Sequence, residues 1–250
     1  DLVSVFIALE LLSIPAYMLA AWRKRDRHSN EAGVKYYLLG VFASAVLLYG
    51  MSLLYGATGS TKLTDIATKL ADHELNGLEV VAVAFVIAGF AFKVSAVPFH
   101  SWAPDTYEGA PTPVTAFLSV LSKTAGFVAL IQLLRVGFAG RSDVIEPLFW
   151  ILSAASMTVG NLIALRQTNI VRMLAYSGVA QAGYRLGGIV VASEKGLSSL
   201  VFYLATYLFM NLAAFAVIVA RERETPFGDD IRGIRGLGAE RPALAWPLTI

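Results

Sequence analysis

Three ionisable side chains lie inside long apolar runs of the sequence, where they could carry protons. Glu10 occurs in FIALELLS, Lys93 in FAFKVSAVPF and Lys123 in FLSVLSKTAGF. A charge at the centre of a membrane costs about 2.5–3.5 kcal/mol on insertion scales unless it is paired or hydrated. A carboxylate that can approach and leave a poorly solvated lysine would form a tunable proton site. Transfer between the lysines would need water or hydroxyls, which the flanking runs supply at Ser95, Thr115, Ser119, Ser122 and Thr124.

The alternative interpretation is that these charges only reach the membrane surface. Long side chains near the end of a span can extend their charged tip to the interface. This alternative is stronger for Lys123 than for Lys93 or Glu10. A fourth ionisable residue, Arg185, lies mid-run beside glycines in GYRLGGIV, and for it the two interpretations carry equal weight.

The two lysine runs are joined by a connector, residues 99–111, that holds His100, Asp105 and Glu108. Pro98, just before it, lacks an N–H group and distorts a helix, and broken helices recur at the ion sites of transporters. The plainer alternative is that Pro98 merely ends its helix. His100 titrates near neutral pH and suits proton uptake, but a lone histidine at a helix end is more often an interfacial hydrogen bonder, so it is the weakest candidate.

The elements that position these residues must be membrane helices. The 250-residue chain is 56% hydrophobic and only 15% charged, whereas an average soluble domain carries about 25% charged residues. A run of about 20 apolar residues spans a membrane core of roughly 30 Å, and the chain contains several such runs. The fold class is therefore all-α, a polytopic transmembrane helix bundle.

The chain reads as a single membrane domain, residues 1–250. Hydropathy predicts seven spans and the start of an eighth, at residues 2–22, 34–56, 78–98, 113–135, 147–165, 173–192, 197–220 and 242–250. Between the second and third spans, Leu63, Ile66, Ala67 and Leu70 share one helical face, which predicts a short interfacial helix. The chain starts without Met and stops inside an apolar run, so we interpret it as a piece of a longer protein.

Basic residues predict the orientation, because they favour the cytoplasmic side of short loops. They gather in the loops after the first, fifth and seventh predicted spans, which places these loops in the cytoplasm. The connector then faces the same side, and Asp105 and Glu108 make it an acidic inner mouth.

Other chemistries find little support. The absence of cysteine excludes disulfides, thiolate ligation of iron–sulfur clusters and a cysteine nucleophile. The three histidines are dispersed without metal-ligand spacing. The glycines of GIRGLGAE follow no predicted strand, so they do not form a nucleotide-binding fingerprint.

The stretch FKVSAVPFHSWAPDTYEGAPTPVTAFLSVLSKTAGF resembles the signature of the antiporter-like membrane subunits of respiratory complex I, the NADH-quinone oxidoreductase. Within that family the chain is most similar to the N-type subunits. DLVSVFIALELLSIPAYMLAAWRKR, NEAGVKYYLLGVFASAVLLYG and QTNIVRMLAYSGVAQAGY resemble the fifth, sixth and tenth helices of that group. The resemblance covers the whole chain and implies part of an inverted-repeat fold with a broken helix near Pro98.

The resemblance implies a proton relay of Glu10, Lys93 and Lys123. The chain departs from many relatives at two positions of the tenth helix, Gln181, where many have His, and Arg185, where many have an apolar residue. Because of these two departures, the resemblance does not assign which residues near that helix take part in the relay.

The function implied is proton translocation, as a subunit of a translocating enzyme. The chain itself is expected to hold no cofactor, because flavin (FMN), iron–sulfur clusters and quinone would lie in other subunits. Expected partners are neighbouring antiporter-like subunits, small membrane subunits and the lipid bilayer, with no nucleic acid. The expected location is the bacterial plasma membrane, or alternatively the mitochondrial inner membrane. A cation/proton antiporter or membrane-hydrogenase subunit of the same superfamily, and a non-pumping scaffold, are the alternative functions.

Overall fold

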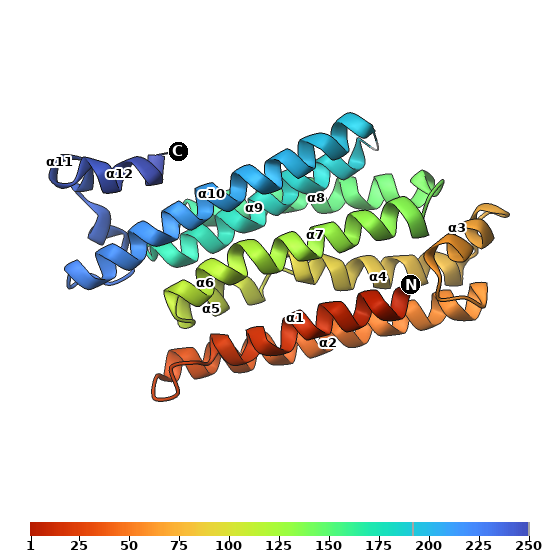
Figure 1. Cartoon of the computed structure of the whole chain (residues 1–250), viewed down its shortest axis with the longest axis horizontal. Helices are drawn as coiled ribbons and strands as arrows, with labels where there is room; N and C mark the ends of the chain where they lie inside the picture. Colours follow the sequence, from red (N-terminus) through yellow and green to blue (C-terminus); the bar gives the residue numbers. More distant parts are fainter. Residues whose placement is uncertain (192, 250) are drawn as a thin grey trace.

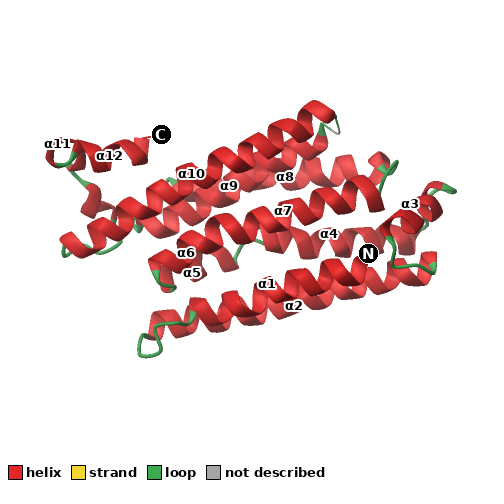
Figure 2. Cartoon of the chain, viewed as in Figure 1, coloured by secondary structure: helices red, strands yellow, loops and turns green. Residues whose placement is uncertain are grey.

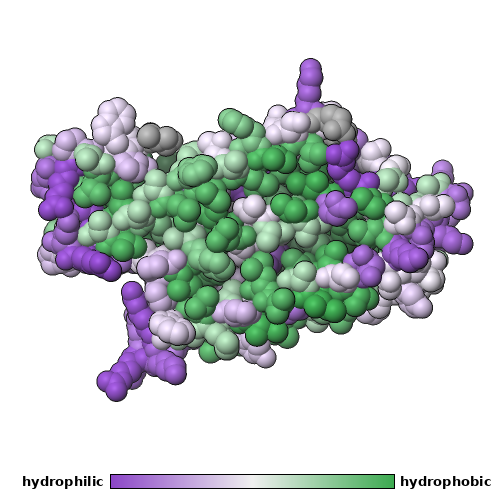
Figure 3. Space-filling model, viewed as in Figure 1, coloured by the Kyte–Doolittle hydropathy of each residue, from purple (hydrophilic) through white to green (hydrophobic). Residues whose placement is uncertain are grey.

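The computed structural model describes residues 1–191 and 193–249, and it confirms the predicted all-helical bundle. The long helices run roughly parallel or antiparallel in one elongated stack, with α1 and α2 on one side, α4 to α7 in the middle and α8 to α10 on the other (Figure 1). Helices account for nearly all of the described chain, and the loops lie mainly at the two ends of the bundle (Figure 2). On the face shown in Figure 3, apolar side chains cover the middle of the bundle and polar ones gather toward its ends.

The long helices are α1 (Leu2–Ala20), α2 (Arg27–Thr58), α4 (Gly77–Val94), α8 (Ser142–Ala164), α9 (Ile170–Val190) and α10 (Glu194–Glu224). A further continuous helical rod is made of α6 (Thr112–Phe117), η1 (Leu118–Ser122), α7 (Lys123–Gln132) and η2 (Leu133–Gly137). The short elements are α3 (Leu63–Ala71), α5 (Trp102–Gly109), η3 (Ile231–Ile234), α11 (Leu237–Glu240) and α12 (Pro242–Thr249).

Six of these helical segments are long and apolar enough to cross a membrane: α1, α2, α4, the rod Thr112–Gly137, α8 and α10. The prediction counted seven such spans. The remaining one, residues 173–192, does fold as α9, but among the described residues it does not reach the apolarity of the other six. The reason is its composition, because α9 contains Arg172, Gln181 and Arg185. It packs against α5, α8 and α10.

The helix that carries Lys93 is broken, as predicted, but earlier than Pro98. Helix α4 begins at a capping box in which Asn76 and Glu79 bond each other's backbone N–H groups. It ends at Val94, because Ser95 adopts a left-handed backbone conformation with φ of 61°. A non-helical segment that includes a cis Val97–Pro98 bond follows before α5 begins. Lys93 therefore lies in the last turn of α4, next to the break.

Tertiary hydrogen bonds satisfy the backbone groups that the break releases. The indole Nε1 of Trp102 donates to the Phe92 carbonyl oxygen at 2.8 Å. The backbone N–H of Val97 donates to Ser156 Oγ of α8 at 2.9 Å. A buried backbone polar group without a partner is costly, so these two contacts make the break stable inside the bundle.

The helix that carries Lys123 is also irregular. The five residues Leu118–Ser122, immediately before Lys123, form a π-helical turn. Such turns are rare and occur frequently at functional sites. Lys93 thus lies just before a departure from α-helical geometry, and Lys123 lies just after another one on a different helix.

The helix predicted between the second and third spans is observed as α3, with Leu63, Ile66 and Leu70 buried against the bundle. The other helix ends differ from the hydropathy boundaries where polar residues continue a helix beyond its apolar run. Helix α2 begins at Arg27 rather than at residue 34, and α10 extends to Glu224 rather than to residue 220.

Helices α8 and α9 make the most extensive contact between long helices, and glycine permits it. A Cβ atom on Gly183 would lie 2.7 Å from the Met157 backbone nitrogen and 2.8 Å from the Ser153 carbonyl oxygen. A Cβ atom on Gly160 would lie 2.5 Å from the Ala180 backbone nitrogen. Small residues allow this approach between membrane helices, and the contact fixes α9 beside the lysine-bearing rod.

We predict that Gly183→Leu forces α8 and α9 apart and destabilises the protein by about 1–3 kcal/mol, as overpacking does. Thermal unfolding of the full-length subunit in detergent measures the effect. The matched control is Gly56→Leu, because no atom lies within 4 Å of a Cβ at Gly56. Equal melting temperatures for the two variants would contradict the packing argument.

Candidate functional site

Lys93 is buried and bonds a serine of the first helix. Its side chain is 7% exposed, and Nζ donates a hydrogen bond to Ser13 Oγ at 2.7 Å. The Ser13 hydroxyl in turn donates to the Leu9 carbonyl oxygen at 2.5 Å. Lys93 therefore does not reach the membrane surface, and its ammonium has an acceptor inside the bundle.

Glu10 lies near Lys93 without touching it. The carboxylate is half-buried, and its Oε1 accepts a hydrogen bond from Ser44 Oγ of α2 at 2.5 Å. Within the described chain no ion pair joins Glu10 to Lys93, although the carboxylate is close enough for its charge to act on the ammonium. The direct Glu–Lys pair suggested by the sequence is thus open, with Ser44 holding one partner and Ser13 the other.

Lys123 is enclosed completely. Its side chain is 0% exposed, and its Nζ has no hydrogen-bond partner among the described residues. The nitrogen lies 5.3 Å from the ring centroid of Tyr107 and 2.9 Å from the position that a Cβ on Gly178 of α9 would occupy. The alternative that Lys123 extends to the interface is therefore wrong for this structure.

The two lysines come from adjacent helices. A Cβ atom on Gly126, one turn after Lys123 on α7, would lie 3.1 Å from Lys93 Cγ. The rod thus packs its lysine-bearing region against the end of α4. Three of the five hydroxyls proposed to bridge the lysines, those of Ser95, Ser122 and Thr124, are buried without a partner in the described chain.

The other two bridging hydroxyls are already engaged. Thr115 donates to the Tyr107 carbonyl oxygen at 3.0 Å. Ser119 donates to the Ala116 carbonyl oxygen and accepts from Asn211 Nδ2 of α10 at 2.6 Å. These two residues therefore hold the rod in place and are weaker candidates for proton transfer than the free hydroxyls.

His100 lies in the break between α4 and α5. It is half-buried, and its ring packs edge-on against Tyr176 of α9 with 6.3 Å between centroids. Lys123 is close enough for its charge to act on the imidazole. The structure thus places His100 near the site, while its role stays a prediction.

The predicted acidic inner mouth is neutralised by basic residues from other helices. Asp105 of α5 bonds Lys35 of α2 at 2.9 Å and Arg172 of α9 at 2.8 Å. The same Arg172 bonds Glu108 at 2.7 Å. We call these four residues the α5 clamp. The sequence suggested an acidic patch because the connector contains no basic residue of its own, whereas the basic partners lie far away in the sequence.

Three residues of the clamp, Asp105, Glu108 and Arg172, lie outside the six candidate spans, whereas Lys35 belongs to α2. Burial alone would raise the pKa of Asp105, but the hydrogen bonds from Lys35 and Arg172, together with their charges, hold this pKa below its ordinary value. A carboxylate with a lowered pKa stabilises the folded state above its unfolded pKa and stops doing so as the pH falls through the lowered value.

Arg185 is buried deep in the bundle rather than extended to the interface. It is 1% exposed, and its guanidinium carbon lies 4.1 Å from the ring centroid of Tyr207 and 5.1 Å from that of Phe127. This placement resolves the two interpretations left open by the sequence in favour of an interior charge.

Sequence reasoning assigned no role to Ser13, Ser44, Gly178 or Tyr207. The role of Ser13 could have been suspected from the sequence, because Ser13 lies one turn from Glu10 on the same predicted helix. No such signal marks Ser44, Gly178 and Tyr207, since their relevance depends on which helices become neighbours.

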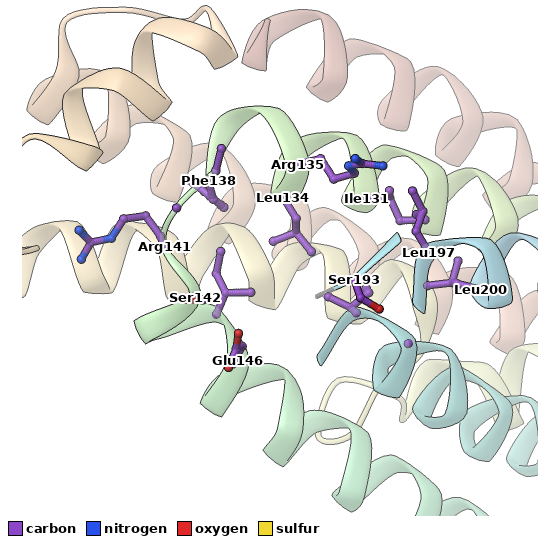
Figure 4. Close-up of a pocket in the computed structure, with 15 residues that line it drawn as sticks. Ile131, Leu134, Arg135, Phe138, Arg141, Ser142, Glu146, Ser193, Leu197 and Leu200 are labelled. Atoms are coloured by element: carbon purple, nitrogen blue, oxygen red, sulfur yellow. The ribbon is translucent and has the colours of Figure 1, made fainter. Parts of the chain in front are cut away.

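A hollow of about 260 Å³, lined by residues of α7, η2, α8, α9 and α10, lies apart from this site. Figure 4 shows its apolar wall, with Leu134 and Phe138, and its polar rim, with Arg141, Ser142 and Glu146. Neither lysine of the site lines it. Within the described residues no group of three or more His, Cys, Asp or Glu side chains is placed to hold a metal ion.

The whole chain, residues 1–250, matches the family described as NADH:quinone oxidoreductase/Mrp antiporter, transmembrane. It is 50% identical to NAD(P)H-quinone oxidoreductase subunit 2 of Synechocystis sp., covering 100% of this chain and 49% of that protein. It is 46% identical to NADH-quinone oxidoreductase subunit N of Trichlorobacter lovleyi, covering 100% of this chain and 52% of that protein. The chain thus spans about half the length of the curated relatives it matches.

Solved structures show the same similarity. A chain of respiratory complex I from Thermus thermophilus superposes with a TM-score of 0.79 at 37% identity, covering 98% of this chain and 52% of that chain. A chain of an archaeal membrane-bound sulfane sulfur reductase superposes with a TM-score of 0.85 at 30% identity, covering 100% and 51%. A chain of a Dietzia Mrp complex superposes with a TM-score of 0.85 at 26% identity, covering 98% and 46%.

We predict that Arg172→Gln releases α5, because it removes the partner shared by Asp105 and Glu108. Amide hydrogen exchange in Trp102–Gly109 should become faster in the variant, and high salt should produce part of the same effect in the parent protein. Glu31→Gln is the control, because Glu31 is exposed and its ion pair is with Lys35 of its own helix rather than with a residue of α5. Unchanged exchange in Arg172→Gln would show that the clamp does not hold α5.

Proposed function

Because the chain belongs to the NADH:quinone oxidoreductase/Mrp antiporter transmembrane family, we propose that it translocates protons across a bacterial plasma membrane as part of an NADH:quinone oxidoreductase. The observation that carries this proposal is the pair of buried lysines on adjacent helices, each beside an irregular helical turn. Ionisable residues inside a membrane bundle are expensive and mark proton or ion pathways. The packing of Gly126 against Lys93 brings the two lysine-bearing segments together.

The similarities favour a complex I subunit over the alternative antiporter. The relatives with 50% and 46% identity are named as quinone oxidoreductase subunits, and identity to the complex I chain, 37%, exceeds the 26% to the Mrp chain. The higher TM-score of the Mrp chain reflects a fold that the two classes share. The antiporter alternative therefore remains second, and the subunits that co-purify with the full-length protein separate the two.

The proposed mechanism uses the open arrangement of Glu10 and Lys93. Ser44 holds the carboxylate and Ser13 holds the ammonium, so these two bonds compete with closing of the pair. Closing would hold a proton on Lys93, and reopening would favour its transfer toward Lys123. Moving one proton against 150 mV costs about 3.5 kcal/mol, which is comparable to the energy of one poorly solvated ion pair.

Redox chemistry would take place in partner subunits. The chain contains no cysteine, and iron–sulfur clusters are held mainly by cysteine thiolates. We propose that flavin, clusters and quinone belong to other subunits and that electron transfer there supplies the signal that opens and closes the Glu10–Lys93 pair. The partners would be neighbouring antiporter-like subunits and small membrane subunits in the same bilayer.

We predict that Lys93→Ala in the full-length subunit abolishes coupled proton pumping by the assembled complex. Lys93→Arg should also fail, because arginine keeps the charge but does not release its proton. NADH-driven acidification of proteoliposomes measures both. Lys69→Ala is the control, since Lys69 lies exposed on α3.

The arginine variant separates a pump from a scaffold. If the lysines only lock helix packing, Lys93→Arg should preserve the packing and pump normally. Normal pumping by an assembled Lys93→Ala complex would overturn the proposed function itself.

We also predict that Ser13→Ala shifts the balance toward the closed Glu10–Lys93 pair, because the ammonium loses its acceptor and an unpaired buried donor costs about 1–3 kcal/mol. Pumping should slow while assembly is kept. Thr158→Ala is the control, because the Thr158 hydroxyl is exposed and bonds only its own helix. Pumping at the parental rate in Ser13→Ala would exclude Ser13 from the mechanism.

A further inference from the structure

Arg185 is a buried cation without a counter-charge. All three of its guanidinium nitrogens are buried, and none forms a well-aligned hydrogen bond in the described chain, although the neutral Tyr207 hydroxyl lies close to them. No carboxylate of the described residues forms an ion pair with it. Its contacts are aromatic faces instead: those of Tyr207, Phe127 and, at 5.9 Å, Tyr203. Such contacts stabilise a cation while leaving its positive charge unneutralised.

The geometry places this charge next to Lys123 along the rod. Gly178 and Arg185 lie about two turns apart on one face of α9, and Lys123 and Phe127 lie one turn apart on α7. Gly178 faces the Lys123 ammonium, whereas Arg185 faces Phe127. The guanidinium therefore lies in the same interface between α7 and α9 as the Lys123 ammonium, one turn further along α7. Its positive charge acts on the lysine.

Polar groups continue beyond this point. Tyr207 Oη lies 3.2 Å from the position of a Cβ on Gly178, close to the Lys123 ammonium. The Tyr203 hydroxyl, one turn away on α10, donates to Gln181 Oε1 of α9. Hydroxyl and amide groups of this kind could continue a proton path from Lys123, and Arg185 lies against the rings of both tyrosines.

We propose that Arg185 is a fixed electrostatic barrier that opposes proton movement past Lys123 and keeps the resting subunit from leaking protons. Arginine remains protonated in proteins, so it repels a proton without being able to carry it. A single arginine acts as such a barrier to protons and cations in other membrane pores. This inference rests on the proposed proton path through Lys123, and it assigns Arg185 a positioning role rather than a catalytic one.

Passive proton flux tests the barrier. The assembled complex with the full-length subunit is placed in liposomes without NADH, and internal pH is followed with a dye after an acid pulse, with valinomycin and potassium present. Arg185→Met removes the charge and keeps most of the side-chain length. We expect its flux to rise about tenfold, which corresponds to about 1.4 kcal/mol of barrier.

Two arginine variants separate charge from shape. Arg185→Lys should remain as tight as the parent, because it keeps the charge. Arg166→Met should also remain tight, because Arg166 is exposed at the end of α8. Parental flux in Arg185→Met overturns the barrier, as does equal leakage in Arg185→Met and Arg185→Lys.

A second pair of variants serves if Arg185→Met does not assemble. Tyr203→Glu places a carboxylate beside the intact guanidinium, and Tyr203→Gln is its uncharged match. Leakage in the glutamate variant alone supports the barrier, and equal flux in the two overturns it. NADH-driven pumping in the same vesicles keeps the two claims apart: a tight, normally pumping Arg185→Met complex overturns the barrier but leaves the proposed function standing.

Discussion

The structure depends on how positive charges are held inside an apolar bundle with little acidic compensation. Lys93, Lys123 and Arg185 are all buried, yet among the described residues none forms an ion pair. Isolated buried charges are expensive, and the usual responses are neutralisation or pairing. Here each of the three cations is stabilised by a different kind of contact. Lys93 bonds a serine hydroxyl, Lys123 lies over a tyrosine ring and Arg185 lies against three aromatic faces.

These contacts of the buried lysines explain why the helices that carry them are irregular. A regular α4 would continue past Lys93, and its carbonyl groups would remain within the helix. The break at Ser95 ends the helix directly after the lysine, and Trp102 and Ser156 stabilise it from outside. The π-helical turn before Lys123 has a similar effect, because it shifts the register of the rod at the point where Gly178 leaves room for the ammonium. Helix irregularity and charge burial are two aspects of one arrangement.

The fold and the candidate residues could be predicted because both depend on local sequence. Apolar runs identify the helices, and charges inside these runs stand out against them. The position of the break could not be predicted from Pro98, because hydrogen bonds from α5 and α8 determine it. The ion pairs of Asp105 and Glu108 were missed for the same reason, since Lys35 and Arg172 belong to distant helices. Arg185 could be interpreted only once Phe127, Tyr203 and Tyr207 were known to surround it.

The open state of Glu10 and Lys93 and the barrier at Arg185 fit together physically. A pump must not conduct when it is idle, so its path has to be interrupted somewhere at rest. In this structure the carboxylate that would hold a proton on Lys93 is bonded to Ser44, and the far side of Lys123 carries a fixed positive charge. Lys123 thus lies between Lys93, whose carboxylate partner is held by Ser44, and Arg185, whose positive charge repels protons. In the proposed mechanism, closing the Glu10–Lys93 pair would load a further proton on Lys93, and reopening it would drive that proton toward Lys123. Only the repulsion added at that step would be large enough to move charge past Arg185.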